Sequence, residues 1–128
     1  AHNWEIKGKM QVPEWIEATS FAINKSRKIV EETKLVWGTQ WSNPLEMALS
    51  MEPPPQVIYF MTDGSAGPQS KETAKDIGRK AKIKGITINC VAMMDPKARD
   101  AMGDLAKRTG GQFTMVTAGG KVEKIKVK

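Results

Sequence analysis

The sequence predicts an α/β fold: a three-layer, Rossmann-like parallel sheet flanked by helices. Two apolar runs, QVIYFMT at 56–62 and GITINCVAMM at 85–94, show no polar alternation. Such runs are typical of strands covered on both faces in parallel sheets. A helical pattern separates the two runs, and another precedes a third strand, QFTMV at 112–116. This alternation with short connections predicts right-handed strand–helix–strand crossovers.

Length and composition are those of one globular domain covering residues 1–128. Hydrophobic residues make up 40% of the chain and charged residues 27%, an ordinary soluble composition. No apolar run approaches the roughly 20 residues that a membrane helix needs, so we expect no membrane segment. Cys90 lies alone in an apolar strand pattern, which favours a buried, inert thiol. The sequence does not indicate a cellular compartment.

The N-terminal third is predicted to hold one short strand at most, followed by a helix. The stretch NWEIKGKMQVPEW at 3–15 is irregular. Ser20 can then cap a helix that runs to about Glu32. Its apolar positions recur at helical spacing, namely Ala22, Ile23, Ile29 and Val30.

A second helix is predicted to start at Asn43. The Asn43 side chain can accept hydrogen bonds from free backbone N–H groups at the helix start, and Pro44 suits the first turn. The Glu46 side chain can reach back to the backbone N–H of Asn43. This helix should end near Met51. The stretch EPPPQ at 52–56 then returns the chain to an extended conformation before the first buried strand.

Two further helices are predicted between the strands. Ser70 is expected to cap the first, which ends near residues 84–86 and carries an apolar stripe of Ala74, Ile77 and Ala81. Asp95 is expected to cap the second, with Pro96 in its first turn and its end at Gly110. Its stripe consists of Ala98, Ala101, Met102 and Leu105.

Asp63 ends the first buried strand, in YFMTDGSAG, where a charge is costly unless something binds or pairs with it. The stretch DGSAG could equally form a tight turn in which Asp63 accepts backbone hydrogen bonds. The loop GTQWSN at 38–43 adds the hydroxyl of Thr39. Ligands bind at the carboxyl ends of parallel strands. A carboxylate and a hydroxyl meeting there would form an all-oxygen site, which suits a hard cation such as Mg²⁺.

Three segments resemble a von Willebrand factor type A domain: GTQWSNPLEMALSMEPPPQVIYFMTDG, GITINCVAM and MGDLAKRTGGQFTMV. The resemblance covers about Ser20 to Val116. It implies a non-catalytic protein-binding module with a metal-ion-dependent adhesion site for Mg²⁺, Mn²⁺ or Ca²⁺. Thr39 and Asp63 match the family's ligating threonine and aspartate, and an acidic group of the protein partner would complete the coordination. The expected partner-binding rim consists of Trp41, Ser42, Gly64 and Ser65.

The chain departs from this family in one respect. The family's Asp-x-Ser-x-Ser motif precedes the position of Asp63, whereas no aspartate precedes Asp63 in this sequence. The first strand and helix of the family are therefore expected to be missing, the domain to be incomplete, and cation binding to be weak or absent. The strand 56–62 would then be an exposed edge. We accordingly expect a homo-oligomer, or association with a missing N-terminal segment.

Two other functions are open at this point. An α/β hydrolase or phosphotransferase could use Asp63, although DGSAG lacks the second carboxylate of the haloacid dehalogenase type. A basic nucleic-acid-binding domain would use the net charge of +6, concentrated in KETAKDIGRKAKIKG and KVEKIKVK. No aromatic residue interleaves with these lysines to stack bases, so we expect no nucleic-acid partner.

Overall fold

The computed structural model describes residues 5–6, 9–10, 13–34, 38–64, 67–93 and 96–126. In chain order the elements are β1 Glu5–Ile6, β2 Lys9–Met10, α1 Ser20–Glu32, α2 Ser42–Leu49, β3 Val57–Thr62, α3 Gln69–Ile83, β4 Thr87–Met93, the 3₁₀ helix η1 Pro96–Ala98, α4 Arg99–Thr109, β5 Phe113–Val116 and β6 Val122–Ile125.

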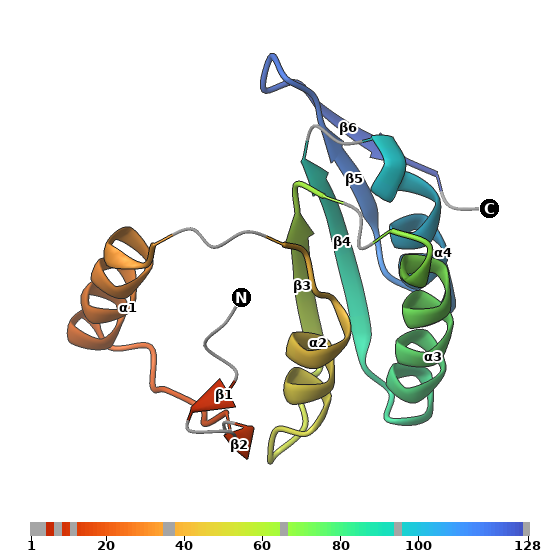
Figure 1. Ribbon diagram of the computed structural model, residues 1–128. Coiled ribbons are helices and arrows are strands. Elements are labelled where there is room, and N and C mark those ends of the chain that lie inside the picture. The colour runs from red at the N-terminus through yellow and green to blue at the C-terminus, as the bar shows by residue number, and fades with distance from the viewer. Residues whose placement is uncertain are drawn as a thin grey trace.

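The main sheet has four strands in the order β3-β4-β5-β6 (Figure 1). β3, β4 and β5 are parallel, with Val57 opposite Thr87 and Cys90 opposite Phe113. Helices α3 and α4 connect them, which confirms the α/β class and is consistent with a Rossmann-like fold. β6 pairs antiparallel to β5 and was not predicted. A tight turn joins these two strands, with Gly120 at a φ of 73°.

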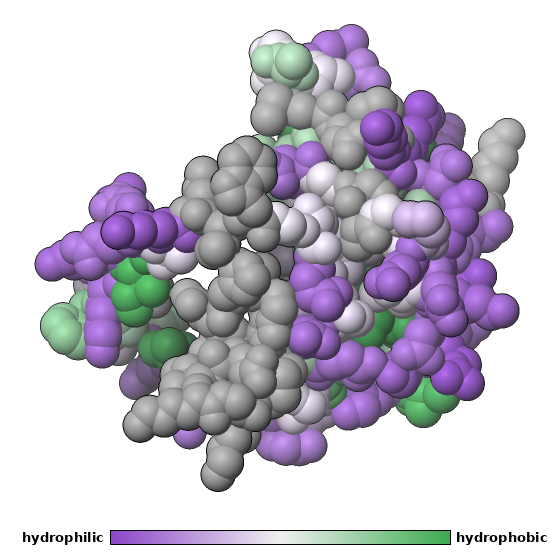
Figure 2. All heavy atoms as spheres, viewed as in Figure 1, coloured by the Kyte–Doolittle hydropathy of each residue, from purple (hydrophilic) through white to green (hydrophobic). Residues whose placement is uncertain are grey.

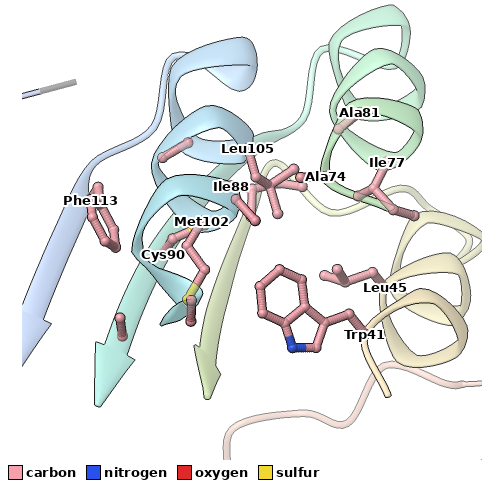
Figure 3. Close-up of a cluster of buried hydrophobic side chains, with 14 of the residues drawn as sticks. Trp41, Leu45, Ala74, Ile77, Ala81, Ile88, Cys90, Met102, Leu105 and Phe113 are labelled. Carbon is pink, nitrogen blue, oxygen red and sulfur yellow. The ribbon is translucent and has the colours of Figure 1, made fainter. Parts of the chain in front are cut away.

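Helices α2, α3 and α4 pack on one face of the sheet and form the core with it (Figure 3). The predicted stripes of α3 and α4 are buried as expected. Ile77 from α3 and Leu105 from α4 meet Ile88 from β4, and all three are at most 1% exposed. Phe113 of β5 extends this core toward β6.

The other face of the sheet is open at β3. Val57, Tyr59 and Met61 point there and are 46%, 73% and 63% exposed. The expectation that this strand is covered on both faces is therefore wrong. None of the residues of α1 is buried, although Ile29 and Val30 lie on its apolar stripe. Figure 1 shows α1 at a distance from β3, so α1 does not cover this face.

The predicted helix starts are shifted by one or two residues. Thr19, not Ser20, caps α1, because its Oγ1 accepts a hydrogen bond from the Ala22 N–H at 3.1 Å. α2 begins before Asn43, at Ser42. Ser70 lies inside α3 and is buried. Asp95, the expected cap of the last long helix, lies outside the described residues.

Candidate functional site

Thr39 and Asp63 lie on the same rim of the molecule. Thr39 comes three residues before α2, and Asp63 follows the last residue of β3. Both border a hollow of about 360 Å³, whose walls are the segments 38–41 and 59–63 together with Pro44. The fold therefore brings together the two residues that the sequence pattern selected, at the carboxyl end of β3.

A glycine makes this approach possible. The Thr39 hydroxyl oxygen lies 3.1 Å from the position that a Cβ atom would take at Gly64. That separation is tighter than ordinary van der Waals contact, so any larger residue at 64 would press on Thr39. The hydroxyl is thus held against the residue directly after Asp63.

Hydrogen bonds hold Gly64 from two sides. The Thr62 hydroxyl donates to the Gly64 carbonyl at 3.0 Å and accepts from the Gly64 N–H at 3.2 Å. The Trp41 indole N–H donates to the same carbonyl at 3.3 Å. Since the backbone after Asp63 is fixed in this way, the exposed carboxylate of Asp63 is carried by a well-supported turn.

Trp41 is a core residue, and its expected place on the partner-binding rim is wrong. Its side chain is 1% exposed and points toward the sheet (Figure 3). It meets Phe60 edge to face, with ring centroids 5.2 Å apart and an interplanar angle of 78°. A buried indole cannot contact a partner. The Trp41 indole N–H stabilises the turn through the hydrogen bond to the Gly64 carbonyl.

The other predicted rim residues have different positions. Ser42 is half-buried and donates a hydrogen bond to the Gln40 side chain at 3.0 Å. Gly64 is half-buried within the turn. Ser65 lies outside the described residues. Neither the Thr62 nor the Trp41 contact with Gly64 was predicted. The Trp41 contact depends on how α2 and β3 pack together, whereas the Thr62 contact is local, within the turn itself.

The chemistry of the site fits a hard cation in the type of its ligands but not in their number. Thr39 and Asp63 offer oxygen atoms, which Mg²⁺ and Ca²⁺ prefer. Among the residues that the structure describes, no group of three or more His, Cys, Asp or Glu could hold a metal ion. Mg²⁺ commonly keeps several waters and takes one or two carboxylates, so the pair could contribute only part of a coordination shell.

Shifted pKa values occur elsewhere in the described chain. Hydrogen bonds from Lys80 and then Arg79 lower the pKa of Asp76 on α3. The pKa of Lys80 is raised by its hydrogen bonds to Asp76 and Glu46. Cys90 is buried, as the sequence predicted, and burial raises the pKa of its thiol to about 12. A thiol with such a raised pKa is a poor nucleophile near neutral pH.

Comparison of the chain with protein-family models, with curated proteins and with solved structures found no match. Within the described residues, no helix has both the length and the apolar character to cross a membrane. The geometry at the end of β3 is therefore the basis for any functional assignment.

Proposed function

We propose that this chain is a non-catalytic protein-binding module of the von Willebrand factor type A kind, which recognises its partner through a divalent cation. Thr39 and Asp63 would be the chain's cation ligands. One observation carries the proposal: both residues border one hollow at the carboxyl end of a parallel strand, where the Thr39 hydroxyl lies close to Gly64, the residue after Asp63.

The proposed partner is a protein that offers an acidic group. Two side-chain oxygens leave most of the coordination positions of Mg²⁺, Mn²⁺ or Ca²⁺ to other ligands. A cation held in this way would bridge Asp63 and a carboxylate of the partner, which would otherwise repel each other. Such a site binds the cation weakly on its own and more tightly once the partner is present.

The makeup of the hollow favours binding over catalysis. Asp63 is the only titratable group other than Tyr59 among the described residues that line it. A phosphotransferase or hydrolase needs a second group to move a proton or to activate water. The charge distribution likewise gives no support to a nucleic-acid site here, because no Lys or Arg occurs between residues 38 and 70.

A thermal shift measurement with matched variants tests the proposal. If the cation binds with a Kd of about 1 mM, then about 10 mM of it stabilises the fold by about 1.4 kcal/mol, a rise in melting temperature of a few degrees. Asp63→Ala should abolish the rise for Mg²⁺, Mn²⁺ and Ca²⁺ alike. Asp100→Ala, which removes an exposed carboxylate from α4, should leave it unchanged.

Two results would contradict this function. One is a melting temperature that none of the three cations raises at 10 to 50 mM, or a rise that is as large in Asp63→Ala as in the wild type. The other is hydrolysis of an aryl phosphate by the wild-type chain that disappears in Asp63→Ala, which would favour the enzyme instead.

A further inference from the structure

We infer that β3 is a dimerisation strand, and that β3 of a second copy of this chain pairs with it in antiparallel orientation. The inference concerns the sheet edge and is independent of the cation site. In the described part of the chain β3 has one neighbour, β4. The segment 38–41 borders the end of β3 but forms no ladder with it. The outer N–H and C=O groups of the strand are therefore a template for another strand.

The two edges of the main sheet differ in their protection. β6, at one edge, carries Glu123 and Lys124 and is flanked by Lys121 and Lys126. Charged side chains of this kind prevent edge-to-edge association. β3, at the other edge, reads VIYFMT and contains no charge, no proline and no glycine. Only the β3 edge lacks the residues that keep strands apart.

Exposed apolar side chains accompany this unprotected edge. Tyr59 is 73% exposed and Met61 is 63% exposed, side by side on the open face with Val57. A contiguous apolar surface on a strand edge marks an interaction site or an aggregation hazard. Pairing with a second strand would cover part of this surface and satisfy the backbone groups at the same time.

The charge distribution favours a second copy as the occupant. The chain has a net charge of +6, yet residues 38–70 contain no Lys or Arg. Figure 2 shows hydrophilic side chains over α3 and α4, on the far side of the sheet from the β3 edge, and also over α1. Two copies can thus bring their β3 strands together without opposing basic side chains from the segment that contains β3. A two-fold axis also covers two unprotected edges at once, because each copy supplies the uncharged strand that the other needs.

Symmetry limits the register. A two-fold axis perpendicular to the sheet keeps the helices of both copies on the same side, so residues that face each other must point to the same face. We place the axis at Tyr59, near the middle of β3, so that Tyr59 lies opposite Tyr59 of the second copy and Val57 lies opposite Met61. Directly opposed Cα atoms in antiparallel pairs are about 4.5–5.5 Å apart, within the range of about 4.4–6.8 Å that a disulfide spans.

The dimer should be weak. A six-residue strand on each side is far smaller than the roughly 20–30 residues a side of a standard stable interface. We therefore expect dissociation in the micromolar range. Sedimentation or light scattering at about 5 to 500 μM should show the mass rising from 14.1 kDa toward twice that value.

Cross-linking tests the surface and the register together. Tyr59→Cys should form a disulfide-linked dimer with oxidised glutathione, since the two thiols lie across the two-fold axis. Val122→Cys introduces a thiol on the opposite edge of the same sheet and should not. The native Cys90 is 1% exposed and does not compete. Equal or faster cross-linking of Val122→Cys would overturn the inference.

A charge substitution gives a second test that leaves the core untouched. Tyr59→Lys places two like charges directly opposite each other and should weaken dimerisation about tenfold or more. Val122→Lys, also at an exposed apolar residue, should leave the dimer unchanged. A wild-type chain that stays monomeric at 500 μM, or a dimer that survives Tyr59→Lys, would refute the assignment. A chelator should leave the dimer unchanged, because dimerisation does not depend on the cation site. A chain that dimerises but shows no cation-induced thermal shift would therefore contradict the proposed function and not the dimer.

Discussion

Replacement of Trp41 by alanine tests whether the candidate site depends on the core beneath it. The Trp41 side chain is 1% exposed and packs edge to face on Phe60. Its indole N–H also donates to the Gly64 carbonyl, one residue after Asp63. The substitution therefore removes a large part of the packing between α2 and β3 and one support of the turn that carries the proposed ligand.

The expected loss is about 3–5 kcal/mol, the usual range for a buried tryptophan replaced by alanine. The hydrogen bond is a small part of this, about 0.5–1.5 kcal/mol, because the Thr62 hydroxyl still donates to the Gly64 carbonyl. Domains of this size are stable by about 5–15 kcal/mol, so the variant should retain a fold but lose a large fraction of its stability. The melting temperature should fall by roughly 10–20 °C.

Urea unfolding followed by far-ultraviolet circular dichroism measures this loss without relying on tryptophan fluorescence. Trp15→Ala is the matched control: Trp15 is 54% exposed, and its indole N–H donates to the Pro53 carbonyl at 2.8 Å. It should cost about 1 kcal/mol or less. Equal losses in the two variants would refute the core role of Trp41. A cation-induced thermal shift of wild-type size in Trp41→Ala would show that the site does not depend on it.

Two further predictions concern packing and pH. Gly111→Ala should cost about 1–3 kcal/mol or more in urea unfolding, because a Cβ there would lie 2.0 Å from a backbone carbonyl oxygen of β4, whereas Gly119→Ala has no atom within 4 Å and should be neutral. The pKa of Asp76 is lowered from 3.8 by Lys80 and Arg79, so its stabilising effect is present above pH 3.8 and is lost as pH falls through the lowered value. Asp76→Asn should therefore flatten the acid side of the stability profile. Because the Asp76 side chain is 41% exposed, 0.5 M salt should reduce the stability difference between wild type and variant, and an unchanged profile would contradict the ion pair.

Local sequence patterns predicted the elements whose signals are local. The helical stripe that includes Ala74 and Ile77, and the end of α4 at Gly110, were read correctly because spacing and a left-handed cap are properties of a few neighbouring residues. Asp63 was singled out because it ends an apolar strand, and Thr39 because of its loop and its match to the family's threonine; their role as a cation pair stays a prediction. The pattern could not say that Trp41, next to a polar helix start, turns inward.

The order of elements from α1 to β5, the parallel strands and the uncharged character of VIYFMT followed from the amino-acid sequence, because each depends on local spacing and composition. Tertiary structure alone decided that the helices α2 to α4 share one face, that one face of β3 stays open, and that Thr39 meets Gly64. The physical reason is that an apolar strand has the same local pattern whether or not another layer covers it. Its burial depends on segments distant in the chain.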